Sequence, residues 1–227
     1  MKKCIGMAAL IAVAGASASA QQVMQTQSFG PDTPNYEQVL TFDLFDVDIN
    51  DVESIKVKFE LNIDGGSLTV DNDGLDAAVV DVELGATGAL SSTDVTLLNG
   101  AFQPVAEDVE IGTTDTFNLA ANDGDDDQSF DPNGGLDEDT LSGAGQSGMS
   151  MGFINSTFWA DFIGASGTFD ILADVDQILD FGGVGGVSGG FTPVSASGNV
   201  MIIVTIPAPA SAGALAIGAL AFGRRRR

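Results

Sequence analysis

The sequence predicts an all-β protein, with a single β-sandwich or jelly-roll-like domain at residues 21–206 between two short terminal segments. Two observations predict this class: stretches in which apolar and polar residues alternate, and connections rich in Gly, Asn, Asp and Ser. Alternation gives a strand one buried and one solvated side, and many short strands with turn-rich connections are typical of sandwiches. The central region shows no convincing helical periodicity.

The clearest predicted strand covers residues 53–63. Its odd positions are apolar and its even positions polar, so Lys56 and Lys58 are expected on the solvated side. Similar patterns predict further strands at residues 39–45, 79–84, 94–98 and 168–175. Residues 199–206 are apolar on both sides, as expected of a central strand.

Other segments give weaker patterns. Residues 156–162 can form a strand with alternating sides. Residues 122–140, rich in Asp, Gly and Asn, and the Gly-rich residues 142–152 and 182–190 are predicted to be long exposed loops. For residues 182–190 an irregular edge strand is the alternative, because glycine is tolerated where backbones approach closely.

Residues 1–20 have the three parts of an export signal. Lys2 and Lys3 precede an apolar run, and small residues follow that include Ala18 and Ala20. A charged start, an apolar centre and an Ala-x-Ala site predict cleavage by signal peptidase after Ala20. A short buried helix is the alternative. Cleavage removes Cys4, the one cysteine, so the mature chain cannot form disulfides.

Residues 207–227 read as a membrane-directed tail. Pro207, Ala208 and Pro209 precede an apolar stretch that ends at residue 222. This stretch is short against the ~20 residues of a membrane span. The chain ends in a basic cluster made of Arg224, Arg225, Arg226 and Arg227. Arginines favour the cytoplasmic side, which leaves residues 21–206 outside. A single-span anchor that is never processed is the alternative to a cleaved tail.

The charge of the chain is strongly negative and unevenly distributed. The whole sequence has 8 basic and 32 acidic residues, a net charge of −24. Without the six basic residues of the two ends, two lysines and 32 acidic residues remain, which gives a net charge of −30. Such a surface repels phosphate backbones, so nucleic acid is excluded as a partner. Divalent cations, basic proteins and neutral sugars remain compatible with it.

The residue types also limit the possible chemistry. The chain has no histidine, and residues 21–206 have neither cysteine nor arginine. Imidazole bases, thiol nucleophiles and His-ligated metals are therefore absent, so no catalytic residues are assigned. Two carboxylates suffice for glycoside hydrolysis, but solvated Asp side chains in Gly-rich loops lack the apolar pocket that a general acid needs. A carboxylate-dependent hydrolase is accordingly the least favoured class.

Two acidic clusters could bind calcium, which takes six to eight oxygen ligands from carboxylates and carbonyls. The candidate ligands are Asp71, Asp73, Asp76, Asp123, Asp125, Asp127 and Asp131. Neither cluster has EF-hand spacing or the tandem glycine repeats of a calcium-binding β-roll. A solvated acidic loop without metal is the alternative. No other cofactor is expected.

The aromatic residues raise the alternative of a carbohydrate-binding module. Trp159 is the one tryptophan and has Phe153, Phe158 and Phe162 as neighbours in sequence. An exposed indole ring could stack on a sugar, but core packing is the expected position of Trp159.

The two ends and the body carry resemblances to known families. Pro207-Ala208-Pro209, the apolar stretch and the arginine cluster resemble the PEP-CTERM sorting signal, with Ala208 in place of the usual glutamate. The resemblance implies processing near these prolines by an exosortase, with transient insertion in the inner membrane of a Gram-negative-type bacterium.

Residues 21–206 resemble, over most of their length, the choice-of-anchor E domain family. The matching segments are Gln38–Asp46, Ile55–Phe59 and Phe162–Thr168, together with the last apolar strand. The resemblance implies an exported, surface-sorted protein without assigned catalytic residues. We therefore expect a structural or interaction protein of the cell envelope or extracellular matrix, with matrix proteins or extracellular polysaccharide as partners.

Overall fold

The computed structural model describes residues 20–106, 108–122, 124, 135–183 and 185–207. Strands make up 63% of the structure and form antiparallel sheets, which confirms the all-β class. The strands are β1 (Gln21–Asp32), β2 (Tyr36–Asp43), β3 (Ser54–Asp64), β4 (Ser67–Asn72), β5 (Ala78–Ser91), β6 (Val109–Leu119), β7 (Glu138–Ser142), β8 (Gln146–Phe153), β9 (Thr168–Phe181), β10 (Val187–Thr192) and β11 (Ser195–Ile206), with two short 3-10 helices, η1 (Ile49–Asp51) and η2 (Ser156–Asp161).

The first sheet is built around β11 and β3, in the order β1-β11-β3-β8. Along β1 the pairing starts with Gln21 opposite Ile206, and along β3 it starts with Ser54 opposite Thr205. Every second residue of β3 and β11 points inward and is buried, as their alternating sequences require. The prediction of a strand at residues 53–63 is confirmed almost to its ends.

Beyond a bend, the first sheet is followed by a three-stranded sheet in the order β10-β4-β7, whose strands are the sequence neighbours of β11, β3 and β8. Gly65 and Gly66 link β3 to β4 with φ values of +69° and +83°, a conformation that other residues rarely adopt. The Gly143 N–H donates to the carbonyl oxygen of Gly66 at 3.0 Å. A side chain on Gly143 would overlap the carbonyl oxygen of Gly65, so glycine is required there.

The second sheet has the order β2-β9-β5-β6 and covers the first. Its central strands β5 and β9 are both 14 residues long and pair with each other through most of their length. Between the two sheets lies one cluster of buried apolar side chains. Aromatic rings fill its centre: Phe29 lies 5.7 Å from Phe59 between ring centroids, and Phe169 lies 5.6 Å from Phe42.

Side chains close both long seams between the sheets. Gln25 and Gln27 of β1 donate from their amide nitrogens to the carbonyl oxygens of Asp43 and Thr41 in β2, at 2.8 and 2.9 Å. On the opposite seam, the Gln146 amide donates to the Thr113 hydroxyl at 2.8 Å. These bonds give the Asp43 and Thr41 carbonyl oxygens and the Thr113 hydroxyl partners within the chain.

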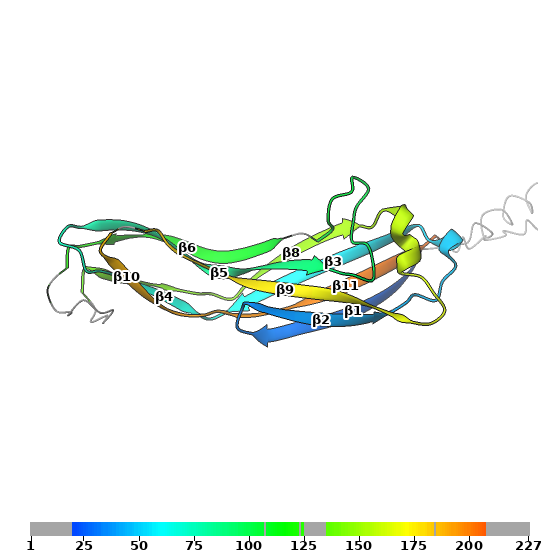
Figure 1. Ribbon diagram of the computed structural model, residues 1–227, viewed down its shortest axis with the longest axis horizontal. Coiled ribbons are helices and arrows are strands. Elements are labelled where there is room, and N and C mark those ends of the chain that lie inside the picture. The colour runs from blue at the N-terminus through cyan, green and yellow to red at the C-terminus, as the bar shows by residue number, and fades with distance from the viewer. Residues whose placement is uncertain (1–19, 107, 123, 125–134, 184, 208–227) are drawn as a thin grey trace, which may run out of the picture.

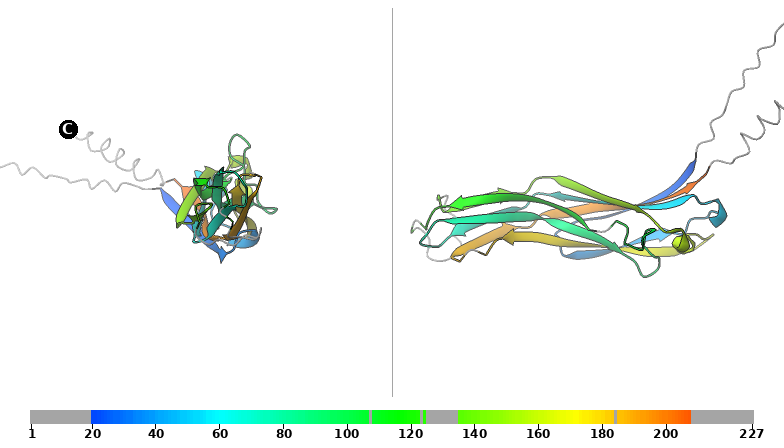
Figure 2. Two further views of the ribbon diagram at one scale, coloured as in Figure 1. Left: turned by 90° about the vertical axis from the view of Figure 1, so that its left-hand side faces the viewer. Right: turned by 90° about the horizontal axis from the view of Figure 1, so that it is seen from above.

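The molecule is elongated, and its strands run along the long axis (Figure 1). Gln21 and Ile206 lie opposite each other at one end, which we name the proximal end, while β4, β10 and the start of β5 lie at the other, the distal end. The two views of Figure 2 show the narrow cross-section and the same long profile. The points where the described chain begins and stops are therefore neighbours.

Three sequence predictions of local structure were wrong. Residues 94–98 form no strand, although Val95 and Leu97 are buried. Residues 156–162, which were interpreted as a possible strand, instead contain η2. The Asn155 side chain caps this helix by accepting from the Thr157 N–H.

The Gly-rich residues 142–152, predicted to be a loop, contain most of β8. Gly148 and Gly152 face the interior, where a side chain would collide with Val109 or Val105, so these glycines permit close packing. In residues 182–190 the edge-strand alternative is correct from Val187 onward, since β10 is an edge strand. The loop predicted at 122–140 ends with the first residues of β7, and residues 123 and 125–134 lie outside the described residues.

The bend gives a stability test with a matched control. Gly143→Ala should lower the free energy of unfolding by roughly 1–3 kcal/mol, because the added methyl group overlaps a backbone carbonyl. Gly145→Ala, two residues away, has its nearest atom at 3.5 Å and should change stability little. Urea unfolding of both variants measures the difference, and equal stabilities would contradict the role given to Gly143.

Candidate functional site

The predicted processing sites lie at the proximal end. Ala20 and Pro207 are exposed and directly precede and follow the paired residues Gln21 and Ile206. The other predicted processing residues, Ala18, Ala208, Pro209 and Arg224 to Arg227, lie outside the described residues. Within the described part of the chain, no helix has the length and apolar character needed to cross a membrane.

The distal end is organised by a buried amide. Asn72 is 1% exposed, and its side-chain nitrogen donates to the carbonyl oxygens of Asp76, at 2.9 Å, and Ala120. Its side-chain oxygen accepts from the Gly74 N–H at 3.1 Å, and its own N–H donates to the Asp137 carbonyl oxygen. The Asn72 side chain therefore ties the turn after β4 to the residue that follows β6, and the Asn72 backbone ties β4 to the residue that precedes β7.

The predicted calcium ligands occupy different environments at this end. Asp71 is 3% exposed within β4, opposite Glu138 of β7 and Ser188 of β10. Asp73 is half-buried, and its Oδ1 atom is inaccessible to solvent and has no hydrogen-bond partner in the described structure. Asp76 is exposed.

The described residues contain no group of three or more His, Cys, Asp or Glu side chains placed to hold a metal ion. The other predicted ligands, Asp123, Asp125, Asp127 and Asp131, lie outside the described residues. The structure therefore brings Asp71 and Asp73 to the distal end without forming a complete coordination site from described side chains alone.

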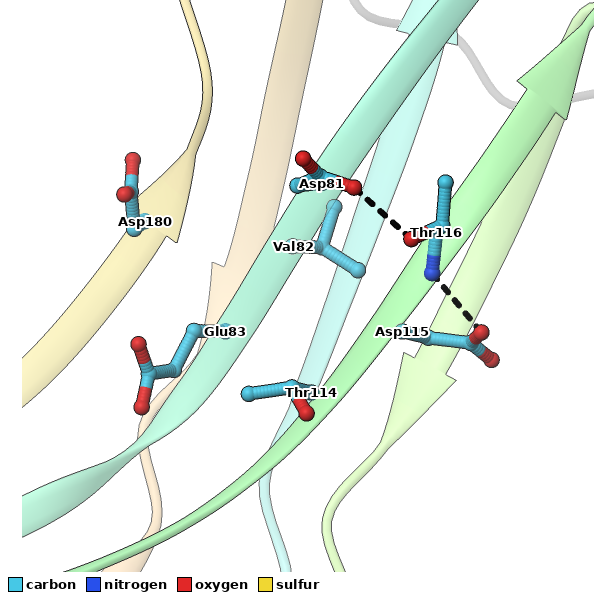
Figure 3. Close-up of a pocket in the computed structure, with 7 residues that line it drawn as sticks. All are labelled: Asp81, Val82, Glu83, Thr114, Asp115, Thr116 and Asp180. Carbon is cyan, nitrogen blue, oxygen red and sulfur yellow. Dashed lines mark hydrogen bonds between the residues drawn. The ribbon is translucent and has the colours of Figure 1, made fainter.

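A shallow acidic depression of about 400 Å³ lies on the outward side of the second sheet (Figure 3). It is lined by Asp81, Val82, Glu83, Thr114, Asp115, Thr116 and Asp180. Thr116 donates from its hydroxyl to Asp81 at 2.7 Å and from its N–H to Asp115 at 2.8 Å. Glu83 lies directly opposite Asp180 on β9, so two like charges face each other.

This depression does not resemble an acid–base catalytic pocket. Asp81, Asp115 and Asp180 are exposed and Glu83 is half-buried, whereas a carboxylic acid that stays protonated needs apolar surroundings. Opposed carboxylates with threonine neighbours can instead attract cations from solution.

The aromatic residues near η2 serve mainly the interior. Trp159 packs against the core, and its indole N–H donates to the Ile154 carbonyl oxygen at 3.0 Å. Phe162 is fully buried and lies edge-on to Phe169, with ring centroids 5.3 Å apart. Trp159 is therefore half-buried against the edge of the core.

The one tyrosine also has a structural position. The Tyr36 hydroxyl donates to the Ala196 carbonyl oxygen at 3.0 Å and so links β2 to β11. Burial, followed by the negative charge of Asp32, raises the pKa of Tyr36 above its usual value. The phenol therefore stays protonated as a donor at neutral pH.

Sequence reasoning missed an apolar and cationic surface on the outward side of the first sheet. Lys56 lies with its ammonium 4.8 Å from the ring centroid of Phe153, and Lys58 pairs with Glu60 at 3.2 Å. Phe153 and Met151 belong to β8, which was predicted as a loop. The alternation of methionine and phenylalanine with small residues over 148–153 is the signal that could have revealed this strand.

Comparisons with known proteins leave the family unassigned. No family model matches the chain, and no curated protein matches it. Among solved structures, that of the infectious bursal disease virus Gt strain is 16% identical, with a TM-score of 0.13 and 99% of this chain covered. That of the Gx strain is 18% identical, with a TM-score of 0.12 and 93% covered. The chain spans about half the length of these structures, 52% and 47%.

The opposed charges of the depression give a test. Asp180→Asn removes the charge facing Glu83 and should raise stability by roughly 0.2–1 kcal/mol at low salt. Asp176→Asn removes the same charge from the same strand opposite Thr87 and should stabilise less. Thermal melts at low and high salt measure both, and a difference that persists unchanged at high salt would contradict a charge effect.

Proposed function

We propose that this chain is an exported, surface-sorted, non-catalytic structural or interaction protein of the cell envelope or extracellular matrix. The observation that carries the proposal is the pairing of Gln21 with Ile206 at the proximal end. The predicted leader precedes the first of these residues and the predicted sorting tail follows the second. Export, sorting and attachment would then all act at one end of an elongated body.

Attachment at the proximal end would direct the distal end away from the cell surface. β10 and β11, of 6 and 12 residues, together span roughly 60 Å along the body. Such a shape suits a spacer or a surface layer more than an enzyme, whose substrate site requires a concave pocket. The resemblance to PEP-CTERM signals and choice-of-anchor E domains supports the same role and names an exosortase as the processing partner.

A carbohydrate-binding module is the alternative class. Its sequence basis was Trp159, whose indole N–H is already used by the Ile154 carbonyl oxygen. The exposed ring of Phe102, edge-on to Phe158 at 6.2 Å, is the aromatic feature that still favours it. We therefore favour the structural or interaction role over carbohydrate binding.

The export proposal predicts the mass and position of the mature protein. In its native cell, the protein should begin at Gln21, have lost Arg224 to Arg227, and be found at the surface or in the matrix. Intact-mass measurement of each cell fraction checks this. Recovery of the whole chain from the cytosol would contradict it, and replacing Arg224–Arg227 by glutamine should block tail processing while leaving leader cleavage unchanged.

We also propose that calcium stabilises the distal end. The supporting observations are the solvent-inaccessible Oδ1 atom of Asp73, which has no hydrogen-bond partner in the described structure, and the burial of Asp71 two residues earlier in the chain. A divalent cation would provide a partner for a carboxylate oxygen that is shielded from water, and calcium accepts irregular oxygen ligand sets.

Calcium should therefore raise the melting temperature, and a chelator should reverse the rise. At a calcium concentration 100-fold above its Kd the stabilisation is about 2.7 kcal/mol, or roughly 5–10 °C for a domain of this size. Asp73→Asn should reduce the shift, whereas Asp46→Asn at the exposed proximal end should not. Equal shifts with sodium chloride at matched ionic strength would assign the effect to screening instead.

A further inference from the structure

We propose that the outward side of the first sheet docks onto the outward side of the second sheet of another copy of this chain. The first surface, the lysine face, consists of Met24, Lys56, Lys58, Met151, Phe153 and Met201. The second, the carboxylate face, consists of Glu37, Val39, Asp170, Leu172 and Asp174.

The lysine face is a continuous surface across four strands. Lys56 has Ile203 of β11 on one side and Phe153 of β8 on the other. Lys58, two residues further along β3, lies in the same way between Met201 and Met151. The cross-strand register thus surrounds each lysine with large apolar side chains.

The apolar members of this face are unusually exposed. Met24, Met151 and Phe153 keep 54%, 51% and 55% of their surface accessible. Contiguous exposed apolar side chains mark interaction surfaces, and methionine adapts its shape to a partner. Burial of these three residues would stabilise a complex by the hydrophobic effect.

Charge selects the kind of partner. Lys56 and Lys58 are the only basic residues between the two terminal segments of this chain. Lys58 is paired with Glu60, whereas Lys56 makes no ion pair in the described structure. Lys56 is therefore available to a partner's carboxylate, and a matching partner also brings an apolar area that accepts methionine and phenylalanine.

The carboxylate face has this composition. Val39, 58% exposed, lies opposite Leu172, and these two apolar residues form the centre. On one side of them Glu37 lies directly opposite Asp174, and on the other lies Asp170. Val39, Asp170 and Leu172 line a depression of about 340 Å³. The opposed carboxylates Glu37 and Asp174 repel each other, so a lysine from another copy would relieve an existing cost.

The two faces lie back to back, with the carboxylate face shifted toward the distal end: Asp170 is nearly level with Lys58, and the Glu37–Asp174 pair lies further along β2. The bonds of Gln25 to Asp43 and of Gln27 to Thr41 fix β1 beside β2, so Met24 is level with the end of β2 that adjoins Asp170. Docking one face on the other is therefore heterologous and can repeat in an open row. In the parallel arrangement of neighbouring copies, every distal end lies on one side, which rests on and deepens the proposed structural role.

Disulfide cross-linking of the full chain tests this contact directly. In a Cys4→Ser background, Met201→Cys labels the lysine face and Leu172→Cys labels the carboxylate face. The double variant should form a ladder of covalent oligomers under mild oxidation at physiological salt, while each single variant should remain mostly monomeric. Dimers from a single variant would mean that a face pairs with itself, and absence of any ladder would mean no contact; either result overturns the proposal.

Charge variants test the recognition. The double variant Lys56→Gln, Lys58→Gln should lower the association constant measured by sedimentation velocity at least tenfold. The control Thr33→Glu, Gln103→Glu makes the same change in net charge at exposed positions and should leave the association constant unchanged. Exchanging the charges, with Glu at 56 and 58 and Lys at 37 and 174, should restore association. If the association constant falls equally in the lysine variant and in the control variant, net charge alone explains the loss and the proposal is overturned.

An anionic polymer is the competing occupant of the lysine face. Polygalacturonate added to the unmodified chain should leave sedimentation unchanged. Lysine-dependent binding of this polymer without any self-association would assign the face to polysaccharide and overturn self-docking. These outcomes do not depend on tail processing, which is measured separately by intact mass. A failure of self-docking can therefore be distinguished from a failure of the export proposal.

Discussion

The position of β11 between β1 and β3 is the constraint on which the first sheet depends. Its inner residues Val200, Ile202 and Val204 are completely buried, and its backbone pairs on both sides. Because this strand lies at the C-terminal end of the body, neither neighbour can reach its final pairing until almost the whole chain is available. Such long-range pairing favours slow folding.

Sequence reasoning succeeded where side chains alternate strictly and failed where backbone packing decides. β3 was predicted because each inward position is a large apolar residue. β8 was missed because its inward Gly148 and Gly152 make room for neighbouring side chains, which resembles loop composition. β1 gave no apolar pattern because Gln25 and Gln27 use their inward-leaning amides for hydrogen bonds to β2.

The candidate sites were predictable only in part, since a sequence does not show which strands lie side by side. The acidic residues around Gly74 were singled out as calcium ligands, which stays a prediction. The burial of Asp71 within β4 depends on β7 and β10, neither of which was expected as a regular partner. The solvated position of Lys56 followed from alternation. Its apolar surroundings came from Phe153 of a distant segment and could not be derived from local pattern.

The glutamine bridges along the β1–β2 seam have a consequence for crowding. A free strand edge offers unpaired amides and carbonyls to any other chain, and dense layers of β proteins are prone to amyloid-like growth through such edges. Here the Asp43 and Thr41 carbonyls are already occupied from within. Molecules held close together on a surface could therefore touch through their broad faces while resisting irreversible fibril formation.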